Sequence, residues 1–371
     1  MLNWRDPENP RAGGAERVTQ AYLRELVERG HEVLWYTCGF SNCRKQTELD
    51  GVQIVRGPSS TLGSRVAARQ WATGKEPFDL VVDQHHGLPW FAHWWNRGRT
   101  LSYIHEALGP IWSAFYPWPL NRIGMGVEYA THRLFRDQLF WTGCEATKQQ
   151  LRDRGVKQVK VVSYGVDTKV LDPLPTKTIE SNLRLLVVCR LAPNKRVAHA
   201  IEALSTLRER GHPAELRIVG GGDDEPSLQA RVKALELESS VVFLGRLSEA
   251  RKLEEMRDAH FLLHTSVREG WGLNVVEANA MGTPAIVYPV AGLTESTLHD
   301  RTGWVVDEET PESLAEGIVE SASNDVRYQR WRSAGRERAK ALHWNNIAPR
   351  AARWLESLAD GAPFETETLG P

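Results

Sequence analysis

Short runs of apolar residues alternate with amphipathic stretches along most of the chain. In the first half, these runs predict strands at 31–37, 52–55, 79–84, 100–105, 139–143 and 159–165. In the second half, they predict strands at 183–190, 214–220, 240–245, 260–266, 283–289 and 303–307. The stretches between them predict helices, among them 15–29, 195–210, 226–237 and 248–258. Near-continuous apolar strands separated by amphipathic helices are typical of parallel sheets covered on both faces. The sequence therefore predicts an α/β protein with two doubly wound parallel sheets in succession.

The two series of strands are separated by a Pro-rich, polar stretch, DPLPTKTIESN at 172–182, which is typical of a linker. We therefore expect an N-terminal domain at 1–171 and a C-terminal domain at 183–342. The pattern at 343–360 predicts a last amphipathic helix, so 343–371 is expected to be that helix and a frayed tail.

The start of the N-terminal domain departs from this pattern. Only MLNW precedes the Gly-rich stretch RDPENPRAGGAER, where an apolar strand of about five residues is expected. Either the true start lies upstream or the first strand is a stub. A missing central strand would leave unpaired backbone groups on its neighbours.

Length and composition narrow the class of protein. A chain of 371 residues is longer than one core usually supports, which favours two domains. The formal net charge of −1 provides no global basic field, so no nucleic-acid partner is expected. No run of about 18 apolar residues is present, and the first residues lack an apolar signal-peptide core. The four cysteines have no metal-type spacing and are interpreted as reduced thiols of a cytoplasmic protein.

The stretch VREGWGLNVVEANAMGTP at 267–284 reads as a turn followed by a short helix that ends at Gly282. The free N–H groups and partial positive charge of a helix N-terminus favour an anion. Gly270 and Gly272 allow close approach of the backbone to a ligand.

Two acids belong to the same stretch. Glu269 precedes the helix and Glu277 lies roughly two turns along it, too far for a directly paired acid–base dyad. We expect each carboxylate to accept hydrogen bonds from a different hydroxyl-rich part of one long ligand.

Two cations follow the strand LRLLVVC, namely Arg190 and Lys195. At a strand end that faces a ligand, this pair suits a diphosphate and would stabilise charge on a leaving group.

The N-terminal domain offers a second set of polar residues. Gly13 and Gly14 open a helix and favour close approach of an anion or a hydroxyl. Histidines cluster at two strand ends, in the sequences Asp-Gln-His-His and His-Glu. A zinc site is disfavoured, because adjacent residues of an extended chain point to opposite faces.

The segment at 109–136 is aromatic, Pro-rich and mildly basic. Three interpretations stay open: a lid over an acceptor, a surface that rests on a membrane, or an irregular packed connection.

Several motifs carry a resemblance to a known family. EGWGLNVVE resembles the E-x7-E signature of retaining nucleotide-sugar glycosyltransferases of the family-4 type. The resemblance extends over nearly the whole chain, through GGAER, CRLAPNKR, LRIVGGG, VVFLGRLS, MGTPAIV and GLTEST. It implies the GT-B fold, in which two Rossmann-like domains face each other across a cleft. The donor nucleotide would bind the C-terminal domain, the acceptor would bind the N-terminal one, and the last helix would cross back to the N-terminal domain.

The resemblance also assigns roles to the residues. Arg190 and Lys195 would bind the donor diphosphate, Glu269 would hold hydroxyls of the donor sugar, and Glu277 would hold the ribose hydroxyls. Trp271 stands where the family often has Phe. The predicted donor-binding set is Gly13, Gly14, Arg190, Lys195, Glu269, Gly270, Trp271, Gly272, Leu273, Asn274 and Glu277. The predicted catalytic set is His105, Arg190, Lys195 and Glu269, and the acceptor-side candidates are His85, His86 and Glu106.

The expected activity is retaining transfer of a hexosyl unit from a nucleotide diphospho-sugar to a hydroxyl of a glycan, a glycolipid or a small molecule. A UDP-sugar is favoured and GDP-mannose is the second choice. No carboxylate is placed as a covalent nucleophile, so same-face substitution is expected. No Asp-x-Asp motif is visible, so neither a metal nor another cofactor is predicted.

Other functions stay open. One is another GT-B enzyme, such as a sugar-nucleotide epimerase or a phosphorylase. A second is a non-catalytic nucleotide-sugar-binding relative. A hydrolase that uses the two glutamates as its acid pair is disfavoured by their different settings. A cytoplasmic location is expected, with peripheral contact at the inner membrane face as an open question, as is the oligomeric state.

Overall fold

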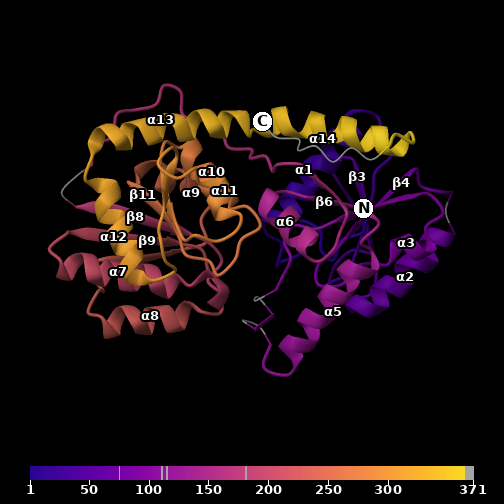
Figure 1. Ribbon diagram of the computed structural model, residues 1–371, viewed down its shortest axis with the longest axis horizontal. Coiled ribbons are helices and arrows are strands. Elements are labelled where there is room, and N and C mark those ends of the chain that lie inside the picture. The colour runs from indigo at the N-terminus through magenta and orange to yellow at the C-terminus, as the bar shows by residue number, and fades with distance from the viewer. Residues whose placement is uncertain (75, 110–111, 114–115, 180–181, 364–371) are drawn as a thin grey trace. The chain divides into compact units, whose positions relative to one another are not determined.

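The computed structural model describes residues 1–74, 76–109, 112–113, 116–179 and 182–363. The chain divides into two compact units (Figure 1). Unit 1 comprises Met1–Gly165 and Trp344–Pro371, and unit 2 comprises Val166–His343. The tail at 364–371, which was predicted to be frayed, lies outside the described residues.

Unit 1 holds two sheets, with strand orders β1-β3-β2 and β4-β5-β6-β7. Its strands are β1 (Leu34–Thr37), β2 (Gln46–Leu49), β3 (Val52–Arg56), β4 (Leu80–Gln84), β5 (Arg99–Tyr103), β6 (Leu139–Thr142) and β7 (Gln158–Val161). Its helices include α1 (Gly14–Glu28), α2 (Thr61–Thr73), α3 (Ala92–Trp95), α5 (Leu120–Leu134), α6 (Glu145–Asp153) and α14 (Trp344–Ala359). All of its strand pairs are parallel except β2–β3.

The first residues supply a short stretch of the missing strand. Leu2 bridges Tyr36 of β1 and Asp83 of β4 in parallel, so it joins the two sheets. Its N–H donates to Val82 O at 2.8 Å, and Gln84 N–H donates to Leu2 O at 3.0 Å. This short stretch therefore pairs with both neighbouring strands as far as it extends.

A cavity of about 480 Å³ lies in unit 1 beside this stub. It is lined by apolar residues from the two sheets and from α1 and α14, among them Leu23, Leu34, Leu80 and Leu355. None of the predicted site residues lines it.

Unit 2 holds one parallel sheet of order β10-β9-β8-β11-β12-β13. Its strands are β8 (Leu183–Val188), β9 (Ala214–Val219), β10 (Val241–Gly245), β11 (Phe261–His264), β12 (Ala285–Val287) and β13 (Gly303–Val305). Its helices are η1 (Pro193–Lys195), α7 (Val197–Glu209), α8 (Glu225–Ala234), α9 (Glu249–Asp258), α10 (Leu273–Ala280), α11 (Leu293–Ser296), α12 (Pro311–Ala322) and α13 (Asp325–Ala341), among the described residues. This is the doubly wound order, in which the connections change direction between β8 and β11.

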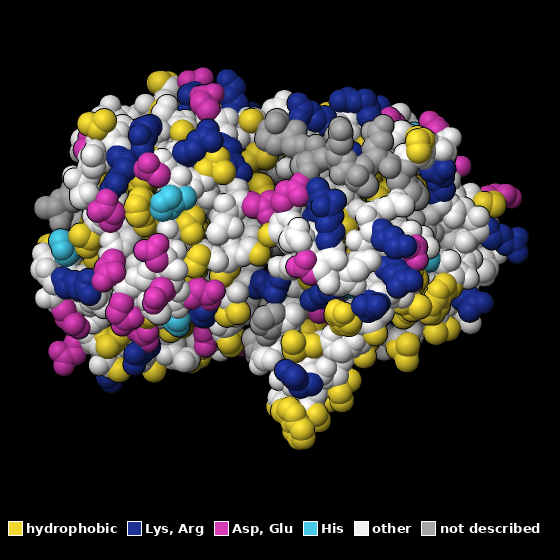
Figure 2. All heavy atoms as spheres, in the orientation of Figure 1, with side chains coloured by type: hydrophobic (Ala, Val, Ile, Leu, Met, Phe, Trp, Pro, Cys, Tyr) yellow, Lys and Arg dark blue, Asp and Glu magenta, His cyan; other side chains and the backbone are white. Residues whose placement is uncertain are grey.

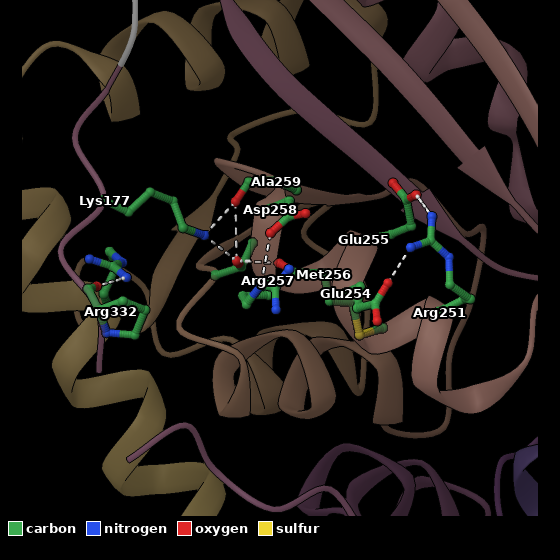
Figure 3. A network of polar contacts seen from close by, with 11 residues as sticks. Lys177, Arg251, Glu254, Glu255, Met256, Arg257, Asp258, Ala259 and Arg332 are labelled. Atoms are coloured by element: carbon green, nitrogen blue, oxygen red, sulfur yellow. Dashed lines mark hydrogen bonds and ion pairs between the residues drawn. The ribbon is translucent and has the colours of Figure 1, made fainter. Parts of the chain in front are cut away.

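The stretch predicted as a linker packs against unit 2 (Figure 3). The Lys177 ammonium donates to Ala259 O at 2.6 Å and to Thr283 Oγ1 at 2.8 Å. Arg332 Nη2 donates to Pro175 O at 2.7 Å. Burial lowers the pKa of Lys177 to about 7. Residues 180 and 181 lie outside the described residues.

Strand β2 is missing from the sequence prediction. Its residues QTEL are half exposed and form no apolar run. The dipeptide Asp50-Gly51 that joins β2 to β3 has positive φ at both residues, as a two-residue hairpin turn requires. The Asp-Gly pair is the one feature of this stretch that points to a hairpin, since QTEL lacks the apolar alternation of a strand.

None of the helices in the described part of the chain combines the length and the hydropathy that crossing a bilayer requires.

The buried histidines of unit 1 make its stability depend on pH. His85 packs edge-on against Phe135 and Phe140, and burial holds its pKa well below 6.5. Within the described residues, neither of its ring nitrogens has a hydrogen-bond partner. Below pH 6.5, His85 is protonated in the unfolded chain but stays neutral in the folded state. Stability therefore falls as pH decreases from 6.5.

We expect His85→Leu to shift acid unfolding of unit 1 to lower pH, because a neutral side chain of similar size removes this uptake. Tryptophan fluorescence measures the transition, since most of the 14 tryptophans lie in unit 1. The control is His212→Leu at an exposed position of unit 2. An unchanged midpoint in His85→Leu would contradict the prediction.

Candidate active site

The strand order of unit 2 determines where a ligand can bind. In open parallel sheets, ligands bind beyond the carboxyl ends of the strands, at the point where the strand order reverses. In unit 2 this point lies between β8 and β11. Lys195 follows β8 and Glu269 follows β11, so two residues predicted from separate motifs meet at this edge.

The loops after β8 and β11 are bound to each other by Arg196 and Thr265. Arg196 has a left-handed backbone, with φ of 47°. Its guanidinium donates to the carbonyls of Thr265 and Ser266, both at 2.9 Å. The Thr265 hydroxyl donates back to Lys195 O at 2.9 Å. These bonds fix the backbone from which the Lys195 side chain extends.

Lys195, Glu269 and His264 form a compact charged cluster. The Lys195 ammonium lies 2.6 Å from Glu269 Oε2, and His264 Nε2 lies 3.5 Å from the same oxygen. Burial opposes ionisation of Glu269, but Lys195 and His264 outweigh it and hold the pKa of Glu269 below its ordinary value. Burial lowers the pKa of His264 to about 4. At neutral pH the cluster therefore consists of an ammonium, a carboxylate and a neutral imidazole.

Arg190 is not part of this cluster. It is exposed, two residues beyond the end of β8, whereas the Lys195 side chain is only 18% exposed. The two cations predicted as a pair thus differ in setting, since only Lys195 is held by a carboxylate.

The turn before α10 is shaped by glycines. Gly272 precedes the helix with φ of 86°, and no side chain caps the helix N-terminus. Gly292 lies directly against this turn, because a Cβ there would come within 2.3 Å of Glu269 O. The close packing of the two loops therefore requires glycine at 292.

The remaining residues of the turn have structural contacts. Trp271 is buried, and the Arg338 guanidinium lies 6.0 Å from the centre of its ring. Asn274 donates its side-chain amide to Val188 O at 2.8 Å, which ties α10 to the end of β8. Leu273 is half buried. The predicted contact of Asn274 with the donor stays a prediction, and its side-chain amide also positions the helix.

Glu277 is buried in α10 and is held by a residue that the sequence analysis missed. Lys252 of α9 places its ammonium 2.9 Å from Glu277 Oε2 and 2.6 Å from Glu249 Oε1. Nothing in the local sequence distinguishes Lys252 from a solvated lysine. Only the packing of α9 against α10 brings it to Glu277.

The Gly-rich turn at 220–222 serves close packing of the backbone. A Cβ at Gly220 would lie 1.8 Å from Cys189 O, and one at Gly222 would lie 2.1 Å from Leu191 O. Gly220 N–H also donates to Gly245 O at 2.8 Å. Close backbone packing therefore explains glycine at 220 and 222, with no need for a dinucleotide-binding role of this turn.

In unit 1, His105 belongs to a buried network of hydroxyls. Its Nδ1 lies 2.7 Å from the Tyr164 hydroxyl and 3.4 Å from the Tyr103 hydroxyl. Burial lowers the pKa of His105 to about 3, so the imidazole is neutral. Its Nε2 has no hydrogen-bond partner among the described residues. Gly143 makes room for the Tyr164 ring, since a Cβ there would lie 2.1 Å from it.

The other histidine candidates have different settings. His85 lies in the core against two phenylalanines and is only 4% exposed. His86 is exposed and stacks on Trp4, with 3.8 Å between ring centroids. Glu106 is partly buried. Within the described residues, no group of three or more His, Cys, Asp or Glu side chains is arranged to hold a metal.

Gly13 and Gly14 lie at the start of α1, as expected. Glu16 in the first turn reaches back to accept a bond from Gly13 N–H at 2.7 Å. Its carboxylate opposes a phosphate at this helix N-terminus. Of the two ligands predicted there, a hydroxyl is therefore favoured over an anion.

Comparison with known proteins decides the family. A model described as Glycosyltransferase Family 4 matches residues 12–170, and one described as Glycosyl transferases group 1 matches residues 175–338. A glycosyltransferase of Methanocaldococcus jannaschii is 32% identical over 94% of this chain and 95% of its own length. The chain is a glycosyltransferase of the family-4 type.

Further relatives of this glycosyltransferase include a mannosyltransferase. The GDP-mannose-dependent alpha-(1-6)-phosphatidylinositol monomannoside mannosyltransferase of Mycobacterium tuberculosis is 30% identical over 93% of this chain and 95% of its own length. Among solved structures, sucrose-phosphate synthase from Thermosynechococcus elongatus has a TM-score of 0.78, at 20% identity over 95% of each chain. An Anabaena protein in complex with UDP and glucose has a TM-score of 0.72, at 19% identity, over 96% of this chain and 99% of its own. The fold is GT-B, as the resemblance implied.

We expect Lys252→Met to destabilise unit 2 of this glycosyltransferase by about 3 kcal/mol, because the variant removes the ammonium that lies 2.9 Å from the buried Glu277 carboxylate. Urea unfolding followed by circular dichroism measures the effect. The matched control is Lys233→Met, at an exposed position of α8. A double variant with Glu277→Gln should recover part of the loss. Equal midpoints for Lys252→Met and Lys233→Met would contradict the assignment.

Proposed function

We propose that this glycosyltransferase moves a hexosyl unit from a nucleotide diphospho-sugar to an acceptor hydroxyl, with retention at the anomeric carbon. The observation that carries the proposal is the cluster of Lys195, Glu269 and His264 at the edge where β8 and β11 meet, next to the uncapped N-terminus of α10.

The cluster supplies both halves of donor recognition. The Lys195 ammonium and the N-terminus of α10 provide positive charge for the diphosphate. The Glu269 carboxylate accepts hydrogen bonds from hydroxyls of the sugar. Arg190, which is exposed on the same loop, adds a second cation when the diphosphate binds. Glu277, whose carboxylate is held by Lys252, accepts the two ribose hydroxyls.

In the proposed reaction, the acceptor oxygen attacks the anomeric carbon from the same face that the phosphate leaves. The bond between that carbon and the phosphate oxygen breaks, and the acceptor proton passes to the departing phosphate. Lys195 and the α10 N-terminus stabilise the negative charge that develops there. Since protein groups supply this charge, we propose that the reaction does not depend on a metal.

His105 is proposed to contact the reacting sugar through Nε2. Two tyrosine hydroxyls converge on its Nδ1. In the proposed arrangement, Tyr164 donates to Nδ1 and Tyr103 donates to Tyr164. The ring proton then resides on Nε2, which acts as a donor. Tyr164 thus acts as a positioning residue that sets the tautomer of His105.

The donor base is proposed from the relatives. The sequence favoured a UDP-sugar. The mycobacterial relative at 30% identity is named as GDP-mannose-dependent, which makes GDP-mannose the first donor to test.

The acceptor proposed is a hydroxyl of a glycan, a glycolipid or a small molecule. A cytoplasmic location is proposed, in keeping with the interpretation of the four cysteines from their spacing in the sequence.

A panel of GDP-, UDP- and ADP-sugars tests the donor, first by thermal shift and then by release of the nucleoside diphosphate. We expect GDP-mannose to stabilise the protein most, and we expect turnover to survive EDTA. A requirement for inorganic phosphate would favour a phosphorylase. Binding without diphosphate release, with every acceptor offered, would favour a non-catalytic protein.

We expect Lys195→Ala to lower kcat/KM roughly 100-fold or more, because the leaving group loses its main counter-charge. Arg190→Ala should lower it by about tenfold. Steady-state kinetics with Lys169→Ala as an exposed control measure both effects. Full activity in Lys195→Ala would refute the proposed site.

Tyr164→Phe tests the tautomer of His105. We expect kcat to fall by about tenfold at unchanged KM for the donor. The acid limb of the pH–rate profile should move to higher pH, because the lost hydroxyl donates to the neutral ring and disfavours its protonation. The matched control is Tyr22→Phe, whose buried hydroxyl donates to Ser163 O at 3.0 Å. A shift of the limb to lower pH would show that Nδ1 is the donor instead.

A further inference from the structure

Helix α5 is attached to unit 1 through polar residues. Glu128 is buried and accepts bonds from Leu108 N–H at 2.6 Å and Gly109 N–H at 3.1 Å. Arg154, directly after α6, lies 3.3 Å from Glu128 and donates to His132 Nδ1 at 2.9 Å. The inward face of α5 therefore carries the charged and polar side chains.

The outward face of α5 is apolar. Leu120, Ile123, Val127 and Leu134 are 53%, 57%, 41% and 57% exposed. Their spacings of three, four and seven residues place them along one side of the helix. A helix on a globular domain normally buries its apolar face, so α5 shows the reverse arrangement.

Large aromatic side chains extend this face. Just before the helix, Trp118 is 79% exposed and Tyr116 is 49% exposed. Tyr129 within the helix is 45% exposed on another side, where its hydroxyl accepts a hydrogen bond from Arg133 Nη1 at 3.3 Å. Residues 110–111 and 114–115 of the same segment lie outside the described residues. Aromatic rings with one polar atom favour the boundary between water and apolar chains.

Basic residues accompany the apolar face. Arg122, Arg133 and Arg136 are exposed on α5 or just after it. The acids of this stretch are compensated, because Glu128 is buried and Asp137 pairs with Lys157 at 2.6 Å. Figure 2 shows hydrophobic and basic side chains together on the projecting part of unit 1 that carries α5.

We propose that the outward face of α5, with Tyr116 and Trp118, docks on an anionic lipid surface. Apolar side chains would enter the acyl boundary while the arginines contact lipid phosphates. A second copy of this chain fits the face less well, because two such faces would bring like-charged arginines together. Of the three interpretations of 109–136, the exposed apolar face favours the membrane surface.

Flotation of the full-length protein with vesicles tests the docking. Vesicles of phosphatidylglycerol mixed with phosphatidylcholine should bind the protein, and vesicles of phosphatidylcholine alone should bind it less. We expect binding to the mixed vesicles to fall at least about tenfold in a double variant, Ile123→Asp with Val127→Asp. Arg122→Glu with Arg133→Glu should remove the preference for the anionic lipid. Leu62→Ser, at an exposed leucine of α2, is the matched control.

Three outcomes would overturn the proposal. The first is no binding of the unmodified protein to the mixed vesicles, and the second is binding that the α5 variants do not change. The third is concentration-dependent self-association in analytical ultracentrifugation that Ile123→Asp abolishes, since a second copy would then occupy the face. The assay contains no sugar donor, so its failure is distinct from failure of the proposed transfer reaction. Circular dichroism of each variant checks that the exposed substitutions leave the fold intact.

Discussion

The bond between the loops that follow β8 and β11 is the interaction on which the rest of the site depends. The strand order of unit 2 brings the carboxyl ends of these strands together, and Arg196 and Thr265 then tie the loops through their backbone carbonyls and hydroxyl. A lysine from one loop and a glutamate from the other can therefore meet at 2.6 Å although they are 74 residues apart in sequence. Without this tie, two long side chains would lose much conformational entropy to form the same pair.

Close contact between backbones is the second constraint, and glycine satisfies it. Gly292 packs on the turn before α10, and Gly220 and Gly222 pack on the loop after β8. The three positions occur in motifs that resemble the glycosyltransferase family. Their geometry shows a steric reason that is independent of any ligand, because a Cβ would overlap a carbonyl oxygen. A glycine motif of this kind can thus indicate the fold as well as a binding site.

Much of this structure could be predicted from the sequence, because strands buried on both faces leave a strong hydrophobic pattern. Every predicted strand overlaps an observed one, and β2 escaped because its half-exposed residues lack that pattern. The positions of Lys195 and Glu269 also followed from local motifs. Lys252 and Tyr164 did not, since their roles arise only when separate elements pack together. His85 was named as an acceptor-side candidate, and its burial could not be predicted, because a sequence does not show whether an imidazole lies in a core.

The mutual pairing of Lys195 and Glu269 has a consequence for recognition. An isolated anion must compete with the carboxylate for the ammonium, and an isolated sugar must compete with the ammonium for the carboxylate. A molecule that carries both a phosphate and hydroxyls at the right spacing replaces both partners in one event. At the proposed site, this pairing would select against fragments, and a joined ligand would bind more tightly than its two halves separately.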